Sequence, residues 1–187
     1  MKISTGQVVW YVMGRFYINA KNEAFDAGYF PFIDGLDGPF FKGDSENKST
    51  AFFTFYADKF TPTAIQNGNL STSLTPPGDW GMYLKHAPNG NWGNPRSFRG
   101  TKQQKIATWS RINTSMSTTV GVTSLSLLTF NLKETWDFEW KGKLYNLRNI
   151  LPYNVTQLGF GSPELLDPLP KYPLIKAFSA SAMLNKK

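Results

Sequence analysis

Glu134 is the residue of this chain whose position most strongly suggests chemistry. It alternates with Leu132 and Trp136, so a regular extended strand would place its carboxyl group on an apolar face. A carboxyl group in such a place must be paired, be protonated, or be moved off the face by a bulge. Facing an interior, Glu134 would serve as a general acid or base.

Two arginines occupy comparable positions. Arg111 alternates with Ala107 and Trp109, and Arg15 alternates with Tyr11. On an inner face, either guanidinium would bind a carboxylate or a carbonyl oxygen of a ligand. The competing interpretation places these charged groups outside, near strand ends, with their stems covering aromatic surface.

The single histidine, His86, comes just before the turn-forming run Pro88-Asn89-Gly90. Because an imidazole exchanges protons near neutral pH, His86 is a candidate for proton transfer. Its alternative is a surface or packing role. We therefore name Glu134, Arg111 and His86 as the candidate catalytic residues.

The composition of the 187 residues excludes many sites. With no cysteine and one histidine, the chain has no disulfide, no thiol nucleophile, no thiolate zinc site and no site that needs two imidazoles. It also lacks the spacing of a calcium loop and of a Gly-x-Ser-x-Gly elbow. We expect neither a metal nor a cofactor, and whether the protein is an enzyme stays open.

Extended strands must position the candidate residues, because residue types alternate along much of the chain with a period of two. Such segments are residues 8–18, 28–33, 50–58, 69–74, 80–85, 105–115, 125–138 and 143–147. Several have two apolar faces, as in a strand that lies between layers or lines a cavity. Closure would remove exposed sheet edges, so we predict an all-β single domain with a closed or nearly closed antiparallel β-barrel of about eight strands. A β-sandwich is the alternative.

The last part of the chain differs in composition from the rest, because it holds five prolines from Pro152 to Pro173. Proline removes a backbone donor, so we expect no central strand there. The predicted organisation is a barrel core over residues 1–149 and a Pro-rich C-terminal extension over residues 150–187, which wraps around the same domain.

A barrel of this size either fills its interior with side chains or holds one small ligand. The candidate ligand-binding residues are mostly aromatic: Arg15, Tyr11, Phe53, Phe55, Trp109, Phe130 and Trp136. The alternative is that the same rings pack into a solid core. Residues 86–104, rich in Gly, Pro and Asn, are expected to form a long loop that guards the mouth of the cavity.

The formal net charge of +7 comes from one segment, residues 80–133, which holds seven basic residues and no acidic one. This segment would attract an anionic partner. It contains no motif of a nucleic-acid-binding protein, so we do not expect nucleic acid to be that partner. No apolar run has the length of a membrane-spanning helix, and residues 1–20 lack the pattern of a secretory signal. We expect no membrane insertion and a cytoplasmic location.

The predicted barrel is similar in form to lipocalin-like proteins and to small-barrel cyclases. Lipocalins carry a Gly-x-Trp signature in the first strand, whereas Gly78-Asp79-Trp80 lies in mid-chain here. The likeness is therefore one of form and transfers no function.

Three functions fit the sequence. The first is the binding of a small apolar or amphipathic ligand in the barrel cavity, and one form of this hypothesis has an anionic ligand. The second is a cyclase or isomerase that acts on such a ligand. The third is a non-catalytic interaction or scaffold protein that exposes Trp80, Trp92 and the basic loop. Association into a homo-oligomer is compatible with each of them.

Overall fold

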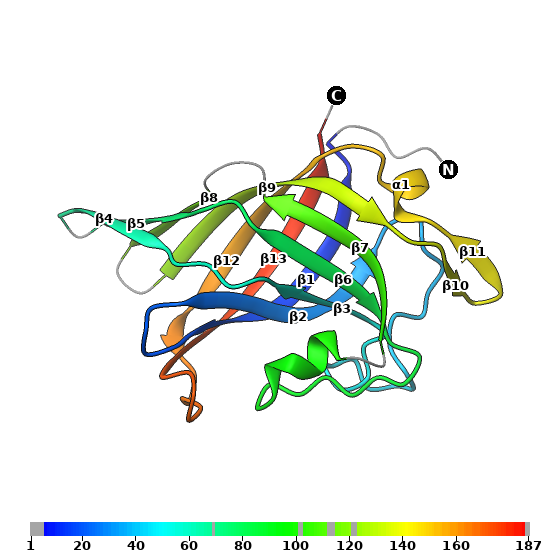
Figure 1. Ribbon diagram of the computed structural model, residues 1–187, viewed down its shortest axis with the longest axis horizontal. Coiled ribbons are helices and arrows are strands. Elements are labelled where there is room, and N and C mark those ends of the chain that lie inside the picture. The colour runs from blue at the N-terminus through cyan, green and yellow to red at the C-terminus, as the bar shows by residue number, and fades with distance from the viewer. Residues whose placement is uncertain (1–5, 69, 101–102, 112–114, 121–122, 186–187) are drawn as a thin grey trace.

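The alternating segments form a closed antiparallel barrel in the computed structural model, which describes residues 6–68, 70–100, 103–111, 115–120 and 123–185. The 8-stranded barrel runs in the order β12 (Val155–Leu165), β13 (Leu174–Leu184), β1 (Val8–Ile18), β2 (Ala24–Ile33), β3 (Phe53–Ala57), β6 (Asp79–Leu84), β7 (Gln104–Arg111) and β9 (Thr123–Thr135) (Figure 1). Strand β9 pairs back onto β12 and closes the ring. The predicted all-β barrel is confirmed, and the sandwich alternative is excluded.

One end of the barrel carries a three-stranded projection. The first part of β9 pairs with both β12 and β8 (Ser115–Val120), while its last part pairs with β7. Strand β8 continues the sheet to β5 (Leu70–Thr75) and β4 (Thr63–Asn67), which extend to the left in Figure 1. The long β9 belongs to both the barrel and the projection, because its first and last parts bond to different strands.

The other end carries a small hairpin of β10 (Phe138–Trp140) and β11 (Lys143–Tyr145), followed by α1 (Leu147–Ile150) (Figure 1). Leu147 and Leu151 are fully buried there and close this end. Apart from α1, the described residues form one 3-10 helix of 5 residues, and neither helix has the length of a membrane span.

The expectation for residues 150–187 is wrong, because this region supplies two strands of the barrel itself. Strand β13 lies between β1 and β12, and β12 closes the barrel against β9. The prolines do not interrupt this pairing, since Pro152 precedes β12 and three others lie between β12 and β13. Pro163 lies within β12 where the register shifts, between Gly161 and Leu165. Two segments counted as barrel strands, 69–74 and 143–147, lie instead in the projection and the small hairpin.

Aromatic rings fill most of the barrel interior. The ring centroid of Trp10 lies 6.1 Å from those of Phe30 and Trp80 and 5.1 Å from that of Trp109. The indole Nε1 of Trp10 donates a hydrogen bond to Oε1 of Gln157 at 2.9 Å. Large rings with satisfied polar atoms make this part of the interior a solid core.

Residues 101 and 102 of the predicted mouth loop lie outside the described part of the chain. Contrary to the prediction, residues 86–100, 103 and 104 do not guard the mouth of the barrel but cover its outer wall. They include the 3-10 helix η1 (Pro95–Arg99), whose Phe98 is fully buried. The hydroxyl of Thr54 in β3 donates to the carbonyl of Phe98 at 2.9 Å. Phe98 belongs to a second apolar cluster, with Tyr17, Phe25, Ala27, Tyr56 and Ile175. The loop is held there because it buries its own aromatic side chains against the outward faces of the strands.

Candidate functional site

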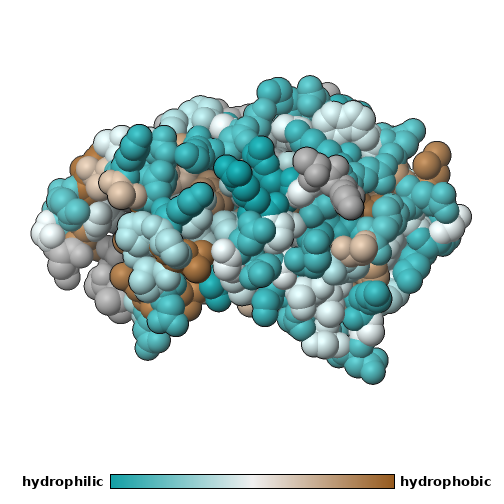
Figure 2. Space-filling model, turned by 60° about the horizontal axis from the view of Figure 1, so that its bottom comes forward, coloured by the Kyte–Doolittle hydropathy of each residue, from teal (hydrophilic) through white to brown (hydrophobic). Residues whose placement is uncertain are grey.

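The barrel is left unfilled at the end from which β4, β5 and β8 project. A cavity of about 400 Å³ lies there, beside the β1–β2 turn and the β12–β13 connection. Its apolar wall includes Phe16, Phe60, Trp80, Leu128, Phe130 and Phe178. In Figure 2, hydrophobic side chains in brown show at this left end among hydrophilic ones in teal. The volume lies within the usual range for small-molecule sites, roughly 300 to 1,000 Å³.

Arg111 brings a positive charge into this cavity. It is the last residue of β7, opposite Phe130 of β9, and its side chain is only 2% exposed. The guanidinium carbon lies 4.2 Å from the ring centroid of Phe60. Gly78 leaves the space that this side chain needs, because a Cβ there would lie 2.8 Å from Nη2. Sequence position, ring contact and a neighbouring glycine together hold the guanidinium inside the barrel.

The guanidinium of Arg111 is not satisfied by the described part of the protein. Its Nε and Nη2 atoms are buried and have no hydrogen-bond partner among the described residues. Within the same residues, Arg111 makes no ion pair at 4.0 Å or less with a carboxylate. A buried donor that lacks an acceptor costs about 1 to 3 kcal/mol, and a charged one costs more. Two donors of the buried guanidinium are therefore left for an acceptor that the described residues do not supply.

Two further charged side chains, Asp26 and Lys176, line the cavity with Arg111. Asp26 lies on β2 opposite Phe16 of β1, where it is half-buried and lines the cavity. Burial raises the pKa of Asp26 to about 6, against the opposing effect of Arg111. Burial also lowers the pKa of Arg111, which Asp26 partly offsets, and the pKa of Lys176. At neutral pH the cavity lining thus has two cations and one carboxylate.

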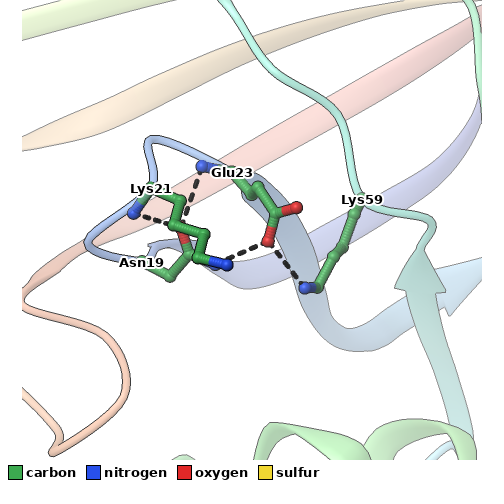
Figure 3. Close-up of polar contacts among 4 residues, drawn as sticks. All are labelled: Asn19, Lys21, Glu23 and Lys59. Carbon is green, nitrogen blue, oxygen red and sulfur yellow. Dashed lines mark hydrogen bonds and ion pairs between the residues drawn. The ribbon is translucent and has the colours of Figure 1, made fainter.

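The β1–β2 turn lies at the rim of the cavity, which its Asn22 lines, and Figure 3 shows the polar contacts of this turn. Oδ1 of Asn19 accepts hydrogen bonds from the backbone N–H groups of Lys21 and Glu23 at 2.9 and 3.0 Å. The Asn19 amide donates to Oε2 of Glu23 at 2.7 Å, and Nζ of Lys59 lies 2.8 Å from the same oxygen. Lys59 precedes the cavity residue Phe60 in the chain. The turn and the segment after β3 are therefore joined at the rim.

The structure places the candidate ligand-binding residues in three different environments. Phe130 lines the cavity. Phe53, Phe55 and Trp109 are fully buried in the solid part of the core. Tyr11, Arg15 and Trp136 lie outside the barrel: Tyr11 is 48% exposed, and the guanidinium carbon of Arg15 lies 4.8 Å from the Trp92 ring centroid.

The structure does not bring Glu134, Arg111 and His86 together. Glu134 is exposed, because the pairing of β7 with β9 shifts register between Trp109↔Leu132 and Thr108↔Glu134. Lys133 is the extra residue of this bulge, so displacement by a bulge, one of the three explanations drawn from the sequence, is the one that the structure shows, and an inward Glu134 is wrong. His86 is exposed at the end of β6. Neither Glu134 nor His86 lines the cavity that holds Arg111.

Sequence reasoning missed Asp26, Lys176 and Trp80 as cavity residues. Asp26 alternates with Gly28 and Phe30, a signal that appears once the strand is begun at Ala24. Lys176 lies on β13, in the region set aside because of its prolines. Trp80, expected to be exposed, is only 3% exposed and lies inside the barrel.

No family model matches the chain, and comparisons with curated proteins and with solved structures likewise find no significant match. No activity can therefore be transferred from a relative. The function has to be argued from the chemistry of the cavity.

Proposed function

We propose that the protein binds a small amphipathic anion in the barrel cavity, with its negative head group on Arg111 and its apolar body against the aromatic wall. The observation that carries this proposal is the buried guanidinium in a cavity of about 400 Å³, with two donors that have no acceptor among the described residues. A planar guanidinium presents paired donors that match a carboxylate or a similar oxyanion.

The distribution of polarity supports an amphipathic ligand rather than a wholly polar one. Phe16, Phe60, Trp80 and Phe178 offer apolar contacts, while the charged groups in the lining are Arg111, Lys176 and Asp26. Two cations outweigh the one carboxylate, so an anionic head group is electrostatically favoured. An alkyl or aromatic body would gain about 25 cal/mol for each Å² of apolar surface that it buries.

The geometry of the cavity gives less support to the other two functions, a cyclase or isomerase and a scaffold protein. For a cyclase or isomerase, the candidate proton-transfer groups Glu134 and His86 lie outside the cavity. For a scaffold protein, Trp80 is not available at the surface, and Trp92 packs on Phe98 with a centroid distance of 4.8 Å. We therefore favour ligand binding over these two functions.

Native mass spectrometry tests the proposal with three probes that share one chain length: decanoate, decanol and decyltrimethylammonium. We expect one decanoate per protein molecule to be retained, with little retention of the alcohol or the cation, because only decanoate supplies a negatively charged pair of acceptor oxygens to Arg111. Equal retention of all three probes, or retention of none, would contradict the proposal.

A further inference from the structure

We infer that the anion enters the cavity together with a proton, and that the carboxylate of Asp26 receives this proton. This inference rests on the proposed function, because it requires an anion on Arg111. It makes ligand binding at that site depend on pH: the protein takes up the ligand in mildly acidic conditions and releases it in alkaline ones.

The geometry places Asp26 where an incoming anion must affect it. Asp26 and Arg111 line one cavity and interact electrostatically, although no ion pair joins them within 4.0 Å. The lining residues next to Asp26 on neighbouring segments, Phe16 of β1 and Phe60 after β3, carry no charge. An anion on Arg111 would therefore add its charge to a confined and mostly apolar space.

The charged groups around Asp26 come from three elements. Arg111 of β7 and Lys176 of β13 line the same cavity, and no other titratable side chain among the described residues does so. Asp58, after β3, acts electrostatically on Arg111, but its side chain is 64% exposed and it does not line the cavity. Among the described residues, Arg111 is the one charged group that acts appreciably on Asp26.

Without ligand, two effects on Asp26 oppose each other. Burial favours its neutral form and raises its pKa to about 6, whereas Arg111 favours the ionised form. The negative charge of an anion bound to Arg111 would offset the stabilisation that Arg111 gives to the ionised form of Asp26. The pKa of Asp26 must therefore rise further when the anion binds.

The sign of the pH dependence follows from linkage. Because the bound state holds the proton more tightly, affinity for the anion is highest below the pKa of free Asp26, near 6, and falls as pH rises toward the pKa in the complex. Each unit by which binding raises that pKa weakens binding tenfold over this range. We expect the dissociation constant to increase by about 10-fold to 100-fold between about pH 5.5 and about pH 8.

Isothermal titration calorimetry with decanesulfonate tests the inference, because a sulfonate stays ionised over the whole range. Wild-type protein is expected to bind more weakly at the higher pH, and titration in two buffers of different ionisation enthalpy is expected to show proton uptake near neutrality. Asp26→Asn imitates the protonated side chain, so it should bind tightly at both pH values without proton uptake. Asp58→Asn is the matched control, an acid outside the cavity, and it should keep the wild-type pH dependence.

The possible outcomes separate the two proposals. If decanesulfonate binds through Arg111 but Asp26→Asn keeps the pH dependence, the proton inference is overturned and the binding function stands. If decanesulfonate does not bind, or binds equally to wild type and to Arg111→Met, the binding function itself is overturned. A carbon-13 NMR titration of the Asp26 carboxyl group in wild-type protein gives a second measurement that does not depend on a folded variant. A pKa that does not rise when decanesulfonate is added would also overturn the inference.

Discussion

Replacing Arg111 by methionine is expected to make the ligand-free protein more stable and to weaken its binding of decanesulfonate by about 10-fold to 100-fold. Arg111 is buried, and two of its nitrogens lack acceptors among the described residues. Methionine fills an irregular space with a flexible apolar side chain and removes the cost of the buried charge. The weaker binding follows from losing charge-assisted hydrogen bonds that contribute about 1.5 to 3 kcal/mol.

The expected gain in stability is about 1 to 2 kcal/mol, because a loss partly offsets the benefit. The contact of the guanidinium with the Phe60 ring, at 4.2 Å, is lost in the variant. Denaturant unfolding without ligand measures the stability, and calorimetry measures the binding. Arg15→Met is the control, since Arg15 lies outside the barrel on Trp92 and should leave the binding unchanged. A destabilised Arg111→Met protein with wild-type affinity would contradict both the burial argument and the proposed role.

Gly28→Ala is expected to destabilise the barrel by about 4 kcal/mol or more, a large part of the 5 to 15 kcal/mol that holds a typical domain folded. Gly28 of β2 lies opposite Gly14 of β1, and a Cβ at Gly28 would lie 2.2 Å from the carbonyl oxygen of Met13. It would also lie 2.7 Å from the Phe55 ring. Because the nearest atom belongs to the backbone of a paired strand, no side-chain rotation relieves the clash.

Thermal and denaturant unfolding of Gly28→Ala measure this effect. The matched control is Gly100→Ala, where a Cβ would lie 3.3 Å from Nε2 of Gln103, the end of a flexible side chain. The control should change the free energy of unfolding by less than about 0.5 kcal/mol. A Gly28→Ala protein as stable as this control would show that β1 and β2 do not pack as closely as described.

The strand pattern of the sequence predicts the closed barrel, because alternation is a local property that survives in the fold. In β1 the inward Trp10 and Phe16 and the outward Tyr11 and Arg15 follow the expected period of two. The alternation alone cannot say which of these two faces turns inward. The chemistry of Tyr11 and Arg15 therefore favours them as cavity residues, although the closed sheet places them outside.

The sequence alone does not determine the features that depend on pairing, although it includes a bulge among the explanations for Glu134. The bulge at Lys133, which turns Glu134 outward, exists only because β9 pairs with β7 in a shifted register. The prolines near β12 and β13 exclude strands only if they fall within the paired part of a ladder, and most of them lie in the connection. The cavity depends on which rings fill the closed barrel. Arg111 could be named from its alternation, whereas the alternation of Asp26 appears only when the strand is begun at Ala24, before the predicted start at residue 28.

A crystal structure of the protein with 8-bromooctanoate tests the central claim most directly, because the bromine atom locates the ligand through its anomalous scattering. We predict bromine density within the barrel cavity, among the rings of Phe16, Trp80 and Phe130, and the carboxylate within hydrogen-bond distance of Arg111. The outer wall, where Tyr11 and Phe160 are 48% and 53% exposed, offers the ligand an alternative apolar surface. Bromine density on that outer wall, with the cavity unchanged, would contradict the account.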